Sequence, residues 1–174
     1  RHQLTVEYYE NAGGAVAKFA ATVTQTATCA VGQYRAEYFN NATLSGTPVL
    51  TRCEAAIDDD WGTGGPGNGV PSDNFSVRWT GQFDFTGGSY TFTATADDGI
   101  RAWLDTDPLV DAWKDQAPTT YTADRTVTQA RHQVTVEYYE KAYGAVAKFA
   151  WAPNQATTTT TTTTTTLPTT TTTT

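Results

Sequence analysis

The chain has 174 residues, a formal net charge of −7 at pH 7, and five Trp, nine Tyr and seven Phe. Its eighteen acidic and eleven basic residues include no basic run, which disfavours binding to a nucleic-acid backbone. No apolar stretch approaches the ~20 residues that a membrane helix needs, so membrane insertion is not expected. Gly, Asp, Asn, Thr and Pro recur at short intervals, which indicates an all-β chain.

The first twenty residues of the sequence are repeated almost unchanged near its end. Residues 1–20 and 131–150 are identical at seventeen of twenty positions and differ only at positions 4, 11 and 13 of each copy. The later copy closes a module that begins near residue 32, so residues 1–28 are expected to be the last hairpin of a preceding repeat plus a linker.

An alternative use of the duplicated hairpin is assembly. An isolated two-stranded hairpin is marginal in water, so residues 1–20 need a sheet to join. They could take the place of residues 131–150 in a neighbouring copy, and such head-to-tail strand exchange would propagate a fibre. The chain begins at Arg1 without the basic and apolar regions of a signal peptide. We therefore expect either that a signal peptide has been removed or that the sequence is an excerpt of a longer chain.

Strands are predicted from alternation of apolar and polar residues. The runs are 34–39, 48–53, 75–85, 89–96, 100–105, 109–113, 133–139 and 145–151. Gly87-Gly88 is expected as a hairpin turn, and residues 142–144 as the turn of a last hairpin. Residues 61–71, with five glycines and two prolines, are expected to form an irregular loop. The spacing predicts an antiparallel β-sandwich over residues 29–152.

The two cysteines, Cys29 and Cys53, are expected to form a disulfide. The bridge would close a loop of about 25 residues and contribute on the order of 3 kcal/mol in an oxidising environment. Asn41 and Asn74 begin N-glycosylation triplets.

Residues 153–174 form a Thr-rich stretch that is expected to be an O-glycosylated linker outside the cytosol. The expected acceptors are Thr157, Thr158, Thr159, Thr160, Thr161, Thr162, Thr163, Thr164, Thr165, Thr166, Thr169, Thr170, Thr171, Thr172, Thr173 and Thr174.

Four stretches of the chain resemble the protective-antigen-type (PA-14) family, a β-sandwich of bacterial toxins, glycosidases and fungal adhesins. They are YRAEYFNNATLSGTPVLTR at 34–52, IDDDWGTGGPGNGVPSDNFSVRWTGQFDF at 57–85, GSYTFTATADDGIRAWLDTDPLVDAW at 88–113 and RHQVTVEYYEKAYGAVAKFAW at 131–151. The resemblance implies an extracellular module, often a glycan-binding one.

The resemblance also implies a calcium site. In the fungal adhesin branch, two successive aspartates joined by a cis peptide hold a Ca²⁺ ion that ligates sugar hydroxyls, and Asp97 and Asp98 look like that pair. Neighbouring side chains of an extended strand point to opposite faces, whereas a cis peptide turns both carboxylates to one side. Ca²⁺ takes about 6 to 8 oxygen ligands. Gly99 is expected to let the backbone bend; the alternative is a turn with solvated carboxylates.

Two tryptophans and a run of aspartates are further candidates for sugar or metal contacts. Trp61 and Trp113 are the candidates for stacking on a sugar ring. Residues 58–60, three successive aspartates, are expected as a solvated loop. One histidine in each copy is too few for a zinc site. No Ser-His-Asp set and no pair of a catalytic acid and base stands out, so no enzyme is expected.

The sequence therefore favours a non-catalytic glycan-binding or adhesion module of a repetitive secreted protein, with glycans and neighbouring copies of the module as partners. The alternative is a structural repeat or spacer of a glycosylated fibre or stalk. A third possibility, the accessory domain of a glycosidase, requires a catalytic domain beyond this chain.

Overall fold

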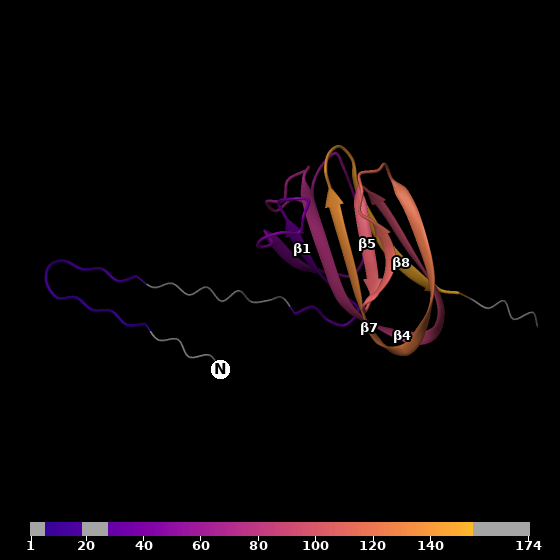
Figure 1. Ribbon diagram of the computed structural model, residues 1–174, viewed down its shortest axis with the longest axis horizontal. Coiled ribbons are helices and arrows are strands. Elements are labelled where there is room, and N and C mark those ends of the chain that lie inside the picture. Colours follow the sequence, from indigo (N-terminus) through magenta and orange to yellow (C-terminus); the bar gives the residue numbers. More distant parts are fainter. Residues whose placement is uncertain (1–5, 19–27, 155–174) are drawn as a thin grey trace, which may run out of the picture.

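Residues 28–154 fold into a β-sandwich (Figure 1), and the computed structural model describes these residues together with residues 6–18. The strands are β1 (Tyr34–Phe39), β2 (Leu50–Glu54), β3 (Ile57–Gly62), β4 (Phe75–Asp97), β5 (Gly99–Leu104), β6 (Asp107–Ala112), β7 (Thr119–Glu140) and β8 (Ala145–Pro153). Among the described residues, no helix is long and apolar enough to cross a membrane. The predicted all-β, antiparallel sandwich is confirmed.

Two long strands, β4 and β7, belong to both layers of the sandwich. They pair antiparallel in one register from Phe75 opposite Glu140 to Ala96 opposite Thr119. One layer has the order β2-β1-β4-β7-β5-β6, while the far half of β4 pairs with β8, which pairs with β3. The layers are thus parts of one hydrogen-bonded network that folds over on itself (Figure 1).

The prediction of a hairpin turn at Gly87-Gly88 was wrong, because β4 continues through both glycines. Before them β4 pairs with β1, as at Gly81 opposite Tyr34, and after them it pairs with β8. Gly87 and Gly88 have φ angles of 79° and 117°, which side chains with a Cβ rarely adopt. The glycines therefore bend the strand from one layer into the other.

The prediction of a hairpin at residues 131–150 was also wrong. The end of β7 pairs with β4 and β5 in one layer, whereas β8 pairs with β3 and β4 in the other. The segment 131–150 is an arch that contributes one strand to each layer, and it is called the closing arch below. Residues 58–60, expected as a loop, lie in β3, where they pair with β8.

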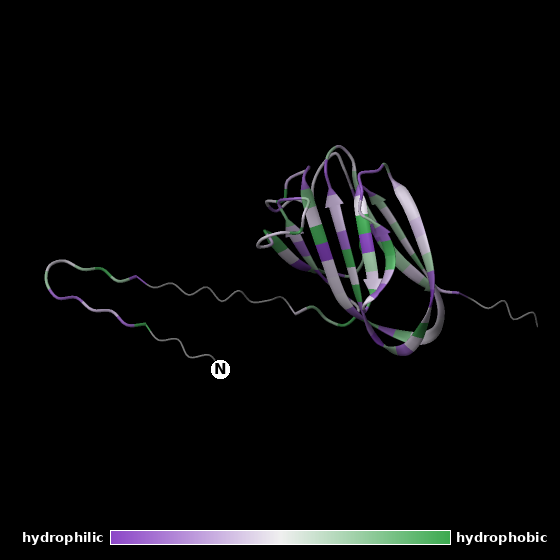
Figure 2. Cartoon of the chain, viewed as in Figure 1, coloured by the Kyte–Doolittle hydropathy of each residue, from purple (hydrophilic) through white to green (hydrophobic). Residues whose placement is uncertain are grey.

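Large aromatic side chains fill the space between the layers. Tyr38, Phe75, Trp79, Phe92 and Tyr138 are each fully buried. Figure 2 shows apolar and polar residues alternating along the strands, as expected where one face of each strand is buried. A disulfide joins Cys29 to Cys53 of β2, with the Cα atoms 5.5 Å apart. It ties the start of the domain to the edge of its larger layer.

Candidate functional site

Three carboxylates converge where β4, β5 and β7 end or begin. Asp97 ends β4, Asp98 precedes Gly99 of β5, and Glu140 ends β7. One carboxylate oxygen of each of the three acidic residues lies within 4.8 Å of the other two. The peptide bond between Asp97 and Asp98 is cis. The structure thus brings together the two aspartates named from the sequence and adds a third carboxylate.

Backbone donors hold the carboxylate of Asp98 in place. Its Oδ1 accepts a hydrogen bond from the backbone N–H of Gln116 at 3.1 Å, and its Oδ2 accepts one from that of Lys141 at 2.9 Å. The side chain of Gln116 also donates to the Asp98 carbonyl oxygen at 2.9 Å. Because each carboxylate oxygen has a second lone pair, Asp98 is oriented and still able to ligate a cation.

Glu140 is a buried acid whose carboxylate receives too few hydrogen bonds from the described residues. It is 0 % exposed, and among the described residues its Oε1 has no hydrogen-bond partner. Its Oε2 lies 3.1 Å from the hydroxyl of Tyr138, but that hydroxyl donates to the Asp97 carbonyl oxygen at 2.5 Å. A phenol has one hydrogen to donate, and the Asp97 carbonyl oxygen is the closer acceptor. The Tyr138 hydroxyl therefore does not donate to Glu140.

Burial and mutual repulsion shape the titration of this cluster. Burial, followed by the charges of Asp98 and Asp97, raises the pKa of Glu140 to about 7. Burial and the neighbouring Asp98 also raise the pKa of Asp97. A nearby positive charge would stabilise the ionised form of each carboxylate. The donors are all hard oxygens, which fits Ca²⁺, and Asp97, Asp98 and Glu140 are the residues that would hold it.

A small pocket adjoins the carboxylates. It has a volume of about 290 Å³ and is lined by Asp98, Asp115 and residues 141–143. Lys141 forms an ion pair with Asp115, which also accepts a hydrogen bond from the hydroxyl of Tyr139 at 2.7 Å. The hydrogen bonds from Lys141 and Tyr139 lower the pKa of Asp115. The pocket therefore presents both charged and polar groups next to the acidic cluster.

Trp113, a predicted sugar contact, lies beside this pocket. Its ring meets that of Tyr139 edge to face, with the centroids 4.7 Å apart, and the guanidinium of Arg101 lies 4.3 Å from its ring centroid. Trp113 is half-buried. It is connected to the pocket residue Asp115 through Tyr139, whose hydroxyl donates to that carboxylate.

Trp61, the other predicted sugar contact, packs against the core. Its ring centroid lies 5.4 Å from that of Phe75 and 5.8 Å from that of Tyr138. The side chain is half-buried. These contacts give Trp61 a packing role behind Tyr138.

Gly99 is required for a different reason than the expected bend. A Cβ at this buried position would lie 2.1 Å from Cε1 of Tyr139, far inside van der Waals contact. The missing side chain therefore lets the ring of Tyr139 lie against the backbone next to Asp98. Gly99 positions the residue that contacts Asp115.

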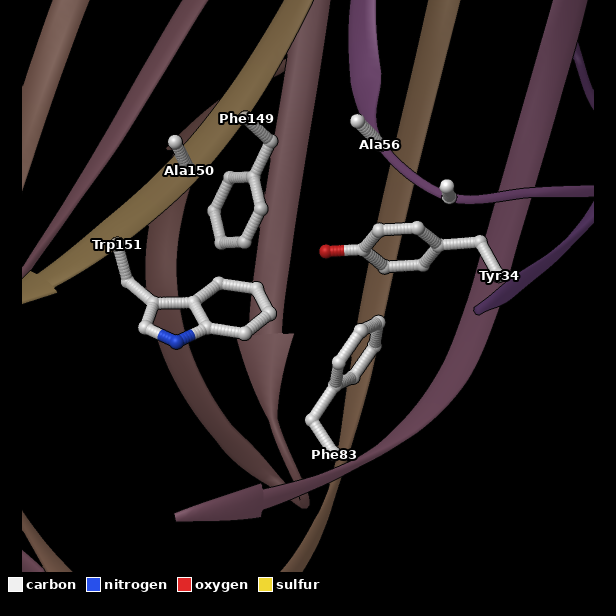
Figure 3. A pocket seen from close by; sticks show the side chains of 7 residues that line it. Tyr34, Ala56, Phe83, Phe149, Ala150 and Trp151 are labelled. Carbon is white, nitrogen blue, oxygen red and sulfur yellow. The ribbon is translucent and has the colours of Figure 1, made fainter. Parts of the chain in front are cut away.

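A second pocket, distinct from the acidic cluster, is apolar (Figure 3). It has a volume of about 240 Å³, and Tyr34, Phe83, Phe149 and Trp151 line it together with three alanines. The Tyr34 hydroxyl is buried and, among the described residues, has no hydrogen-bond partner. The polar side-chain atoms of its lining are the Tyr34 hydroxyl and the Trp151 indole nitrogen, with no carboxylate among them, so these side chains offer no set of ligands for a metal ion.

The predicted glycosylation residues fall in different settings. The side-chain oxygen of Asn41 accepts the backbone N–H groups of Thr43 and Ser45, and its amide nitrogen donates to the Ser45 carbonyl at 3.0 Å. Asn74 is exposed just before β4, with a φ of 56°. The threonines named at 157–174 lie outside the described residues.

Glu140 was missed by the sequence analysis although a signal for it exists. Val134, Val136 and Tyr138 alternate on the inward face of β7, and Glu140 is the next residue in that series. An acidic residue on an apolar face is unusual unless something pairs with it. The alternation, extended by two residues, would have placed a carboxylate in the core.

Comparison with known proteins gives relatives with this fold. Residues 30–164 match the PA14 domain model. The chain is 36% identical over 121 residues to anti-sigma-I factor RsgI3 of Acetivibrio thermocellus, covering 68% of this chain and 18% of that protein. It thus spans less than a fifth of the length of this curated relative.

Solved structures show the same fold. An anti-sigma factor domain-containing protein superposes with a TM-score of 0.65 at 35% identity, over 69% of this chain and 42% of that one. A PA14 sugar-binding domain from an RTX adhesin superposes with a TM-score of 0.60 at 20% identity, over 71% of this chain and 90% of that one. The model match covers most of the described domain, and the chain belongs to the PA14 domain family.

Proposed function

We propose that this chain is an extracellular, non-catalytic carbohydrate-binding module whose sugar contact depends on a Ca²⁺ ion held by Asp97, Asp98 and Glu140. The observation that carries the proposal is that a carboxylate oxygen of Glu140 lies within 4.8 Å of carboxylate oxygens of Asp97 and Asp98, while its buried Oε1 has no hydrogen-bond partner among the described residues. A divalent cation would satisfy that oxygen and remove the repulsion within the cluster.

Calcium provides chemistry that suits a sugar ligand. With three carboxylates bound, a Ca²⁺ ion retains open positions that hydroxyl oxygens can fill. The adjoining pocket offers Lys141 and Asp115 as hydrogen-bonding groups, and Trp113 offers an apolar ring face at a greater distance. One structural neighbour is named a sugar-binding domain of an adhesin, which makes glycans the first ligands to test.

The first test is calorimetric titration of Ca²⁺ into the chelator-treated chain. The unchanged chain is expected to bind one ion, and Asp98→Asn is expected to weaken that binding at least tenfold. Asp107→Asn, at an exposed position of β6 outside the cluster, is the matched control and should bind as the unchanged chain does. Equal binding by all three chains would contradict the site.

The second test is a glycan array probed in Ca²⁺ and again in EGTA. Binding that appears only with Ca²⁺, and that Asp98→Asn removes, supports the complete proposal. Ca²⁺ binding without any glycan signal would leave a metal-stabilised structural spacer as the function. Glycan binding that persists in EGTA would contradict the role of the ion.

A further inference from the structure

The first copy of the duplicated segment exposes residues that its twin buries. Residues 6–18 are exposed throughout, and Figure 1 shows them extending away from the sandwich. Val6 is 57% exposed and Tyr8 56%, whereas the equivalent Val136 and Tyr138 are 0% exposed. The copy therefore retains core side chains for which residues 28–154 provide no place.

The described part of this copy has no strand structure, and the architecture of the closing arch explains why. In residues 131–150, the two strands pair with β3, β4 and β5 and do not form a ladder with each other. An arch of this kind satisfies few of its backbone groups by itself. Residues 6–18 accordingly show a bend at residues 12–13 but no strand. The copy needs two sheets, one for each of its arms.

The three differences between the copies preserve the ability to close a sandwich. Position 4 is Leu where Val134 faces the core, so the position stays apolar. Position 11 is Asn where Lys141 reaches outward to Asp115. Gly13 has a φ of 105° and its equivalent Tyr143 one of 82°, a region that glycine adopts more readily than tyrosine.

The place for this arch is already filled in the sandwich described here, since residues 131–150 occupy it. We propose that residues 1–20 complete a second sandwich of the same fold by adding one strand to each of its two sheets. The partner is a PA14-type domain whose own closing arch is absent. Glu10 takes the position of Glu140 in it, a detail that rests on the proposed metal site.

Substitutions in the full chain test whether residues 1–20 act as a closing arch. Val136→Asp with Tyr138→Asp places charges in the core and disables the chain's own arch. At high protein concentration, residues 1–20 of neighbouring molecules are expected to close the sandwich, so cooperative unfolding persists and light scattering shows species larger than a monomer. Adding Val6→Asp and Tyr8→Asp is expected to abolish the folded state.

The control carries only Val6→Asp and Tyr8→Asp and should match the unchanged chain. If the chain with only its own arch disabled is as unfolded as the fourfold variant, the proposal is wrong. It is equally wrong if both variants remain folded, since neither arch would then be needed. All measurements are made in EGTA, so the result does not depend on calcium binding.

A sequence exchange provides a second, independent test. Val134→Leu, Lys141→Asn and Tyr143→Gly together convert residues 131–150 into the sequence of residues 1–20. We expect the melting temperature of this chain to stay within about 5 °C of the unchanged chain, a shift of little more than 1 kcal/mol for a domain of this size. A chain that no longer unfolds cooperatively would overturn the proposal.

Discussion

Glu140→Gln is expected to stabilise the metal-free protein at alkaline pH. The folded state raises the pKa of Glu140 from 4.5 to about 7, so it disfavours the charged form. This penalty is absent below about pH 4.5, grows as the pH rises and is complete above about pH 7. The shift corresponds to about 3 kcal/mol, or roughly 10 °C in melting temperature for a domain of this size. Glutamine keeps the shape and removes the charge.

Thermal unfolding followed by circular dichroism at pH 5 and pH 8.5 in EGTA measures this effect. The melting temperature of the variant should be higher than that of the unchanged chain at pH 8.5 and close to it at pH 5. Glu10→Gln, the equivalent and exposed position of the first copy, is the matched control and should change neither value. A Glu140→Gln chain less stable than the unchanged one at pH 8.5 would refute the reasoning, because the carboxylate would then be favourably paired.

Three further variants test the packing beside the site, the core and the disulfide. The Cβ of Gly99→Ala would meet the Tyr139 ring, so this substitution is expected to lower the free energy of unfolding in urea by about 1 to 3 kcal/mol. An unchanged urea midpoint would contradict the contact. Tyr34→Phe removes a buried hydroxyl without a described partner and is expected to gain about 1 kcal/mol in the same assay; a loss would indicate a hidden partner. Replacing Cys29 and Cys53 by serine is expected to cost about 3 kcal/mol, and dithiothreitol should destabilise only the unchanged chain.

The sequence predicted β1, β2, β5, β6 and β8 to within a few residues, but it missed β3 and the first half of β7 and was wrong about two connections. Alternation placed β1 at residues 34–39, because buried and half-buried residues alternate along most of that strand. Gly87-Gly88 was misread because paired glycines suit both a hairpin turn and a bend within a strand. Residues 131–150 were misread as a hairpin because strands adjacent in sequence usually pair, whereas here the turn joins two layers.

The candidate site was half visible in the sequence. The pair Asp97 and Asp98 stood out as neighbouring acids before a glycine, whereas Glu140 lies more than forty residues away and meets them only through the fold. The need for Gly99 was also hidden, since it depends on where the Tyr139 ring lies. Contacts between distant residues depend on the register of β4, β5 and β7, which alternation alone does not give.

A crystal structure of the chain grown in Ca²⁺ tests the central claim most directly. We expect a single ion with oxygen atoms of Asp97, Asp98 and Glu140 at about 2.3–2.6 Å. An anomalous difference peak at that position, absent from crystals grown in EGTA, would identify it as calcium. Water alone among the three carboxylates at saturating Ca²⁺ would contradict the claim.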